Sequence, residues 1–157
     1  MPIVTTDNLR IITSTLRKIL RSSATTRQLA ELVAPGGQFS GWLARPPQRA
    51  RVALALAGAE VVGWACINPD GRPTWAPVPL IGWFVRPEWR RKGIATLLAK
   101  ALLLQQRPRL LGCTPWPRLA PILVRAGYGC TDAGALSADG SSVDRWAQWA
   151  PAAVRHG

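Results

Sequence analysis

The apolar residues of the chain fall into short runs whose spacing changes along the sequence. From Leu9 to Arg21 they recur at helical spacing, which predicts one amphipathic helix. A second helix is predicted to begin at a capping box of Thr25 and Gln28 and to end at the Pro-Gly-Gly turn of 35–37. We therefore expect two N-terminal helices.

The middle of the chain has the pattern of strands. Residues 51–57 and 61–67 are short apolar runs around a glycine turn, which predicts a β-hairpin. Residues 41–50 are interpreted as a loop. Residues 78–85 are apolar throughout, which predicts a third strand covered on both faces.

The second half alternates helix and strand. Residues 93–106 predict a helix that Pro108 stops, and residues 109–114 a short strand. A short helix ending at Gly127 and a last strand within 138–151 follow. The order predicts a mixed α/β fold in a single domain, residues 1–157. In the helix predicted over residues 93–106, the side chains expected to face the core are those of Ile94, Leu97, Leu98, Ala101 and Leu102.

Charge departs most from an ordinary composition. The chain has 20 basic and 8 acidic residues, a net charge of +12. Residues 1–51 hold eight basic residues and two acids, and residues 86–125 hold nine and one. An arginine-rich genome would explain this, and so would a polyanionic partner bound through an arginine-rich surface. Both explanations stay open.

Other compositional features exclude some classes of function. The three cysteines, Cys66, Cys113 and Cys130, lack metal-ligand spacing, and the single histidine is His156, so we predict free thiols and no metal site. No apolar run approaches the roughly 20 residues of a membrane span. The N-terminus lacks the layout of a signal peptide, so we expect a cytoplasmic protein.

The stretch between the third strand and its following helix carries the clearest chemistry. Arg90, Arg91 and Lys92 come directly before Gly93, where the helix is predicted to begin. A helix start has unpaired N–H groups and a positive dipole, and a glycine lets the backbone approach an anion closely. The stretch therefore predicts a phosphate or pyrophosphate site. It matches neither a Walker loop nor a dinucleotide fingerprint.

The same stretch resembles the acyl-CoA-binding motif of the GNAT superfamily of N-acyltransferases. That motif is a strand ending in V-x-P, followed by [QR]-x-x-G-x-[GA] leading into a helix. Val85 and Pro87 match the first part, and residues 90–95 match the second. The order of elements over about residues 1–150 is similar as well. The resemblance implies a GNAT fold with a central mixed, mostly antiparallel sheet flanked by helices, and acetyl-CoA as cofactor.

The resemblance also implies roles for individual residues. The Gly93 and Ala95 amides would hold the coenzyme A pyrophosphate, and the Val85 backbone would pair with the pantetheine arm. The Trp83 amide, at a strand bulge, would stabilise the developing oxyanion, while its side chain packs in the core. The implied cofactor-binding residues are Val85, Arg86, Arg90, Arg91, Lys92, Gly93, Ile94, Ala95 and Thr96.

A second family motif, N-x-x-A-x-x-L-Y-x-x-x-G-F, is only partly matched. Aligning Gly127 and Tyr128 with its final G-F puts Leu123 at the position of the tyrosine acid and Trp116 at that of the asparagine. The usual proton donor is therefore missing. Tyr128 is a candidate substitute acid, although its position is normally in the core. Glu88 is a candidate base, or else a charge at the helix start, and Trp116 is a candidate substrate-binding residue.

These observations favour an acetyl-CoA-dependent N-acetyltransferase whose acceptor amine lies in an acidic context: a DNA base, a tRNA or an acidic protein. Four tryptophans are predicted in loops: Trp42, Trp75, Trp89 and Trp116. Their rings would either stack on nucleic-acid bases or pack against the rest of the protein. The chain also resembles GNAT-like enzymes that modify nucleic acid, such as Mom-type proteins and toxins acting on charged tRNA. This resemblance is limited to two features, the high positive charge and the missing tyrosine. The alternative is a catalytically inactive GNAT fold that binds nucleic acid or a protein. A monomer and a homodimer are both compatible with the sequence.

Overall fold

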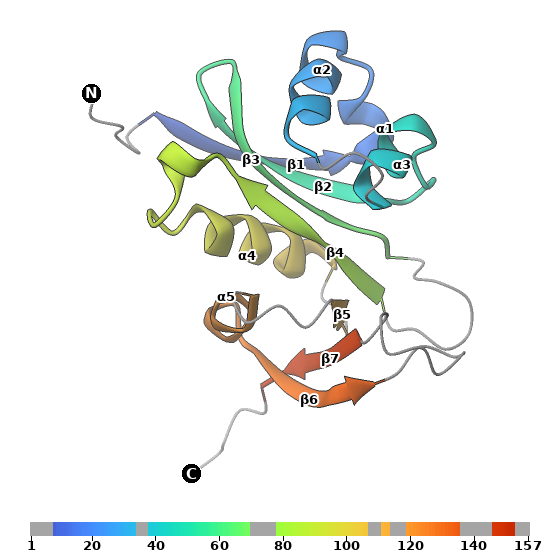
Figure 1. The fold of residues 1–157 in the computed structure, drawn as a ribbon, viewed down its shortest axis with the longest axis vertical. Helices are drawn as coiled ribbons and strands as arrows, with labels where there is room; N and C mark the ends of the chain where they lie inside the picture. Colours follow the sequence, from blue (N-terminus) through green and yellow to red (C-terminus); the bar gives the residue numbers. More distant parts are fainter. Residues whose placement is uncertain are drawn as a thin grey trace.

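The fold is taken from a computed structural model, which describes residues 8–33, 38–69, 78–106, 111–113, 119–135 and 146–152. The described residues form both strands and helices (Figure 1). In order, the elements are β1 (Leu9–Thr15), α1 (Leu16–Ile19), α2 (Ser23–Glu31), α3 (Gln38–Ala44), β2 (Arg51–Ala57), β3 (Glu60–Ile67), β4 (Val78–Val85), the 3-10 helix η1 (Pro87–Trp89), α4 (Ile94–Gln106), β5 (Leu111–Cys113), α5 (Leu119–Arg125), β6 (Tyr128–Ala135) and β7 (Trp146–Pro151).

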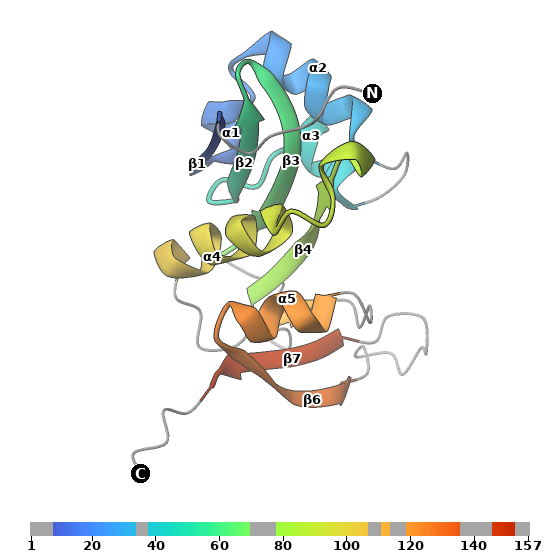
Figure 2. The ribbon, with the colours of Figure 1, turned by 90° about the vertical axis from the view of Figure 1, so that its left-hand side faces the viewer.

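The described strands form one seven-stranded sheet in the order β1-β2-β3-β4-β5-β7-β6. Every neighbouring pair is antiparallel except β4 and β5, which are parallel. Helices α1 to α3 cover one face of β1–β4 and α4 covers the other, while α5 lies beside β6 and β7 (Figures 1 and 2). The predicted mixed, mostly antiparallel sheet flanked by helices is confirmed.

The predicted N-terminal helix is wrong over most of its length. Residues from Leu9 to Thr15 form β1, which pairs antiparallel with all of β2, and only the four residues of α1 are helical. β-Branched residues, among them Ile11, Ile12 and Thr13, favour an extended backbone, and the edge of β2 supplies hydrogen-bond partners for it. The apolar spacing that suggested a helix did not reveal this non-local pairing.

Two further predictions near the N-terminus need correction. Helix α2 begins at Ser23, and its cap is Ser22, whose Oγ accepts the Thr25 N–H at 3.2 Å. Gln28 serves another purpose: its Nε2 donates to the Ala59 carbonyl at 3.1 Å and its Oε1 accepts the Val61 N–H at 2.7 Å. It thereby fastens the β2–β3 turn to α2.

Residues predicted as a loop before β2 include part of helix α3. The Phe39 ring of this helix stacks on the Trp64 ring of β3, with 3.9 Å between ring centroids. The Trp64 Nε1 donates to the Leu32 carbonyl at 3.3 Å. Aromatic packing against the sheet therefore stabilises a helix that its local sequence did not indicate.

The remaining predicted elements are confirmed. The hairpin, the third strand, the helix after it, the short strand and the short helix all lie where the pattern predicted them. Along α4, Ile94, Leu98 and Leu102 are buried against the sheet. Leu97 is an exception, since 46% of its surface is exposed. Burying each such leucine or isoleucine contributes about 1.5–3 kcal/mol, so this helix is held firmly on β2 and β3.

Candidate functional site

Strand β4 is bent by a β-bulge in its middle. Cys66 of β3 pairs with Gly82, but the next residue, Ile67, pairs with Leu80, so Ile81 is the extra residue. Gly82 has a φ of 135°, a conformation that side-chain-bearing residues rarely adopt. Beyond the bulge β4 leaves β5. Among the described residues, the two strands pair at Val78 with Leu111 and at Pro79 with Gly112 and nowhere else.

The backbone groups on the open edge of β4 can be assigned from the register. The Arg86 N–H donates to the Val62 carbonyl at 2.8 Å, so Arg86 faces β3. In an antiparallel pair, successive residues point their N–H and C=O groups to opposite sides. The N–H groups of Val85 and Trp83 therefore point away from β3, toward the open edge. These are the two residues whose backbone the resemblance implied would contact an extended ligand.

Arg90 crosses this edge. Its Nε donates to the Val85 carbonyl at 2.8 Å, and its guanidinium carbon lies 5.3 Å from the centroid of the Phe84 ring. The side chain thereby ties the loop after η1 back to the end of β4 and places a cation at the edge. The motif predicted a charge at this position, but nothing in the sequence indicated which carbonyl it would contact.

Arg86 is directed elsewhere. Its Nε donates to the Val61 carbonyl at 2.9 Å and lies 3.5 Å from an oxygen of Glu60. A register shift against β2 leaves Val62 as an extra residue on β3. Arg86 thus satisfies two carbonyls at a second bulge with its N–H and its side chain. The Arg86 side chain therefore faces the β2–β3 hairpin and not the start of α4.

The loop before α4 has the conformation of an anion site. Arg91 and Gly93 have φ angles of 61° and 78°, and the Gly93 carbonyl accepts the Leu97 N–H at 3.1 Å. The four N–H groups from Gly93 to Thr96 therefore open the helix without a partner inside it, at its positive end. A Cβ added to Gly93 would meet no atom within 4 Å, so the space outside the loop is clear. The exposed side chains of Arg91 and Lys92 flank it. These residues fit a pyrophosphate.

The candidate acid in the second half of the chain is a core residue. Tyr128 is only 7% exposed, and burial raises the pKa of its hydroxyl. It begins β6, and β7 and β5 lie between that strand and β4 in the sheet. Leu123, which occupies the family's tyrosine position, is fully buried. Trp116, the predicted substrate-binding residue, lies outside the described residues.

The other candidates are placed as follows. Glu88 lies on η1 and is exposed. The Trp83 side chain packs against the core beneath α4, as predicted. Of the tryptophans predicted in loops, Trp42 and Trp89 are partly buried against the two cores, which favours packing for them. Trp75 lies outside the described residues.

No metal site is found in the part of the chain that the structure describes, since no three His, Cys, Asp or Glu residues gather there. Cys66 is a buried free thiol whose pKa is raised by burial. Among the described helices, none has the length and apolar character needed to cross a membrane.

An open strand edge leads into a helix start with unpaired N–H groups, a combination that fits an extended molecule carrying phosphate. Comparison with protein families gives this class its name. The model of the acetyltransferase (GNAT) family matches residues 14–116, more than half of the chain. The protein belongs to this family, so the predicted family and its acetyltransferase class are confirmed.

Solved structures share the fold at low sequence identity. A GNAT family acetyltransferase from Elizabethkingia anophelis with acetyl-CoA bound is 12% identical at a TM-score of 0.58, over 94% of this chain and 99% of its own. The Bacillus subtilis acetyltransferase in complex with CoA is 12% identical at 0.56, over 93% and 99%. The ribosomal-protein-S18-alanine N-acetyltransferase from Escherichia coli is 10% identical at 0.56, over 95% and 97%. A search of curated proteins finds no match.

Proposed function

We propose that this acetyltransferase takes its acetyl group from acetyl-CoA and transfers it to an amine by direct attack on the thioester. The observation that carries the proposal is the continuous run from the open edge of β4 to the unpaired N–H groups from Gly93 to Thr96. Neighbours of the same fold with bound acetyl-CoA or CoA support this assignment.

Each part of the site has a separate binding task. The N–H groups from Gly93 to Thr96 receive the pyrophosphate, and Arg91 and Lys92 add positive charge beside it. The Val85 N–H is available to an extended arm lying along β4, in the manner of an added strand. Binding therefore depends chiefly on the backbone, with cationic side chains assisting.

The reaction needs one donor at the carbonyl oxygen. Bound acetyl-CoA supplies a thioester carbon that an amine can attack. The Trp83 N–H, held at the bulge and facing the open edge, donates to the oxygen as negative charge develops on it. The nitrogen–carbon bond forms, the carbon–sulfur bond breaks, and coenzyme A leaves as a thiolate. Gly82 serves this step by allowing the backbone conformation that positions the donor.

The attacking amine must lose its protons. A lysine-like amine has a pKa near 10.4 and is charged at neutral pH. Glu88 is exposed on η1, Glu60 lies beside Arg86, and Tyr128 is a buried core residue. We infer that water carries away one proton before the attack and a second after the nitrogen–carbon bond has formed, and that the chain contributes mainly by positioning the reactants. The thiolate, with a pKa of about 8.5, can leave without an acid.

The acceptor is an amine in an acidic or polyanionic setting, such as a nucleic acid or an acidic protein. The net charge of +12 supports this choice, because a cationic small amine would be repelled. The runner-up is a GNAT fold that binds such a partner without catalysis, a reading that the missing tyrosine favours. The intact loop around Gly93 argues against it, since a pure binding module has no use for a coenzyme site.

Two measurements test the proposal together. Coenzyme A should raise the melting temperature, because a ligand that binds only the folded state stabilises it. Mass spectrometry should then detect transfer of an acetyl group to a member of pooled tRNA, DNA, peptide or small-amine acceptors. A protein that coenzyme A does not stabilise, and that transfers nothing, would be the binding module instead.

A further inference from the structure

We propose that a second anion site, built by α1, the turn that follows it and the loop between α3 and β2, docks the phosphate backbone of a nucleic acid that carries the acceptor amine. This inference deepens the proposed function and rests on it for its catalytic consequence, whereas docking itself can be measured without coenzyme A. We call the site the α1 patch. Its residues are Arg17, Lys18, Arg21, Arg45 and Arg49.

Two hydrogen bonds bring the parts of the α1 patch together across the sequence. The Leu16 N–H donates to the Ala50 carbonyl at 2.7 Å, and the Arg17 Nε donates to the Pro46 carbonyl at 3.4 Å. Arg17 is thereby held against the loop that carries Arg45 and Arg49. Leu16 and Ala50 are fully buried, so the charges rest on a rigid base.

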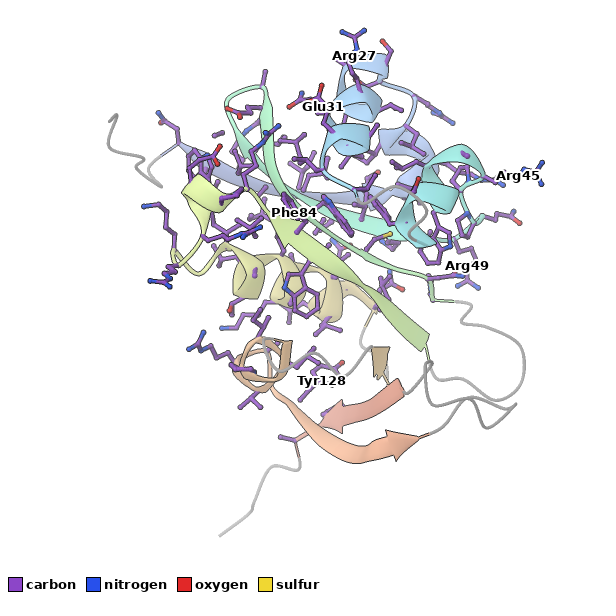
Figure 3. All side chains as sticks on the ribbon, in the orientation of Figure 1. Arg27, Glu31, Arg45, Arg49, Phe84 and Tyr128 are labelled. Carbon is purple, nitrogen blue, oxygen red and sulfur yellow. The ribbon has the colours of Figure 1, made fainter. Side chains whose placement is uncertain are left out.

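All five cationic side chains of the α1 patch are exposed. In the described residues 8–33 and 38–51, the single acid is Glu31. Figure 3 shows Glu31 and Arg27 on α2, well separated from Arg45 and Arg49 in the view. The patch therefore carries only positive charge, spread over α1, the turn after it and the loop before β2. Such a surface attracts an extended polyanion by releasing counterions.

The composition of the α1 patch favours a nucleic acid over an acidic protein. Protein interfaces are built around an apolar centre. The exposed large apolar side chains among the described residues are Leu97, Leu104 and Val124, and these lie on α4 and α5, not on the patch. The patch is four arginines and one lysine, and arginine binds phosphate oxygens through two parallel hydrogen bonds.

The position of the α1 patch suits an acceptor. Leu16 at its base belongs to the core between α1–α3 and the sheet, and the Phe84 ring of β4 packs against the same core. Helices α1 to α3, and with them the patch, lie on the face of the sheet to which Phe84 contributes, and α4 lies on the other face (Figure 1). A nucleic acid docked on the patch would approach the open edge of β4 from the side on which α1–α3 lie.

The test measures binding of a labelled single-stranded RNA, a DNA duplex and unfractionated tRNA by fluorescence anisotropy over a series of salt concentrations. One triple variant carries Arg21→Gln, Arg45→Gln and Arg49→Gln. A matched control carries Arg10→Gln, Arg27→Gln and Arg125→Gln, which remove the same charge elsewhere. Poly-aspartate serves as the competing acidic chain. Coenzyme A stabilisation, measured on both variants, shows that each is folded.

We expect the wild-type affinity to fall steeply with salt. The quantity compared is the slope of the logarithm of the binding constant against the logarithm of the salt concentration. Each lost phosphate contact should reduce the size of this slope by about 0.7 to 0.9, so the slope of the patch variant should be smaller by about 2 to 3 and that of the control by much less. Equal losses in the two variants would overturn the proposal, because the charge would then act without a defined site. Poly-aspartate binding as tight as that of nucleic acid would overturn it in favour of an acidic protein.

A final comparison separates this inference from the proposed function. Gly93→Asp should abolish stabilisation by coenzyme A and leave nucleic-acid binding unchanged, whereas the patch variant should do the reverse. Loss of both properties in one variant would contradict the existence of two sites. Nucleic-acid binding with no coenzyme response in the wild type would refute the proposed function and leave the α1 patch intact.

Discussion

Two cationic regions of this protein are built in different ways. In the loop before α4, the conformation of the backbone presents four N–H groups to an anion, and Arg91 and Lys92 only flank it. In the α1 patch, the charge is carried entirely by exposed side chains on α1, the turn after it and the loop before β2. The first region has the geometry to hold one particular group. The second can hold any phosphate backbone that follows its charges.

The comparison shows why a net charge of +12 does not describe one site. A backbone site is sensitive to a single glycine and tolerant of its neighbouring side chains, because the donors belong to the main chain. A side-chain site loses affinity stepwise, one charge at a time, and weakens with salt. The variants below break one region while leaving the other intact.

The largest effect is expected from a charge at Gly93. Aspartate and asparagine have the same shape and tolerate positive φ better than most residues, so the pair isolates the charge. Gly93→Asp places a carboxylate beside the pyrophosphate, where repulsion at about 4 Å is worth about 4 kcal/mol at the effective dielectric of a protein surface. We expect coenzyme A affinity to fall about 100-fold or more, measured by isothermal titration calorimetry. Gly93→Asn should lose less than about tenfold. Equal losses would mean that strain, and not charge, governs the site.

The next effect concerns the donor at the bulge. Gly82→Ala forces a side chain onto a backbone with a φ of 135°, which costs about 1–3 kcal/mol of strain and displaces the Trp83 N–H. Removing an oxyanion donor lowers kcat about 100- to 1000-fold, so a displaced donor should lower it about 10- to 100-fold. The KM for acetyl-CoA should change little.

A glycine in the hairpin turn supplies the matched control for that experiment. Gly58 has a φ of 60° and lies in the turn between β2 and β3, outside β4, so Gly58→Ala introduces strain at a positive φ away from the Gly82 bulge. It should lower the melting temperature and leave kcat unchanged. A similar fall in kcat in both variants would assign the effect to stability alone.

A smaller effect is expected from the side chains of the loop. Arg91→Gln with Lys92→Gln removes two exposed charges but keeps every backbone donor. Because exposed charges contribute little in water, coenzyme A affinity should fall only about 3- to 10-fold. Direct titration at two salt concentrations measures this. A loss as large as that of Gly93→Asp would show that the side chains, and not the backbone, hold the anion.

The smallest effect is expected at the buried tyrosine. Tyr128→Phe should leave kcat within about twofold of wild type and lower stability by about 0.5–1.5 kcal/mol. Because burial raises the pKa of Tyr128, the hydroxyl stays protonated at neutral pH. Above about pH 10 the unfolded chain loses this proton first, so stability should fall with rising pH, and less so in the variant. A tenfold loss of kcat would instead identify Tyr128 as the acid.

The parts of the fold that depend on local sequence could be predicted. The loop around Gly93 follows from a glycine, a helix start and neighbouring charges, all within a few residues. The prediction of an N-terminal helix was wrong because β1 depends on pairing with β2, some forty residues away. The spacing of apolar residues does not encode such a pairing. Likewise, the contacts of Arg86 and Arg90 depend on two bulges and on carbonyls from other strands.

The most direct test of the central claim is a titration of coenzyme A followed by the backbone amide signals in a 1H–15N NMR spectrum. If the main chain holds the anion, the amides from Gly93 to Thr96 should shift most, together with those of Val85 and Trp83. The amides of the α1 patch should not move. Largest shifts on the α1 patch, with the Gly93 amide unchanged, would contradict this account.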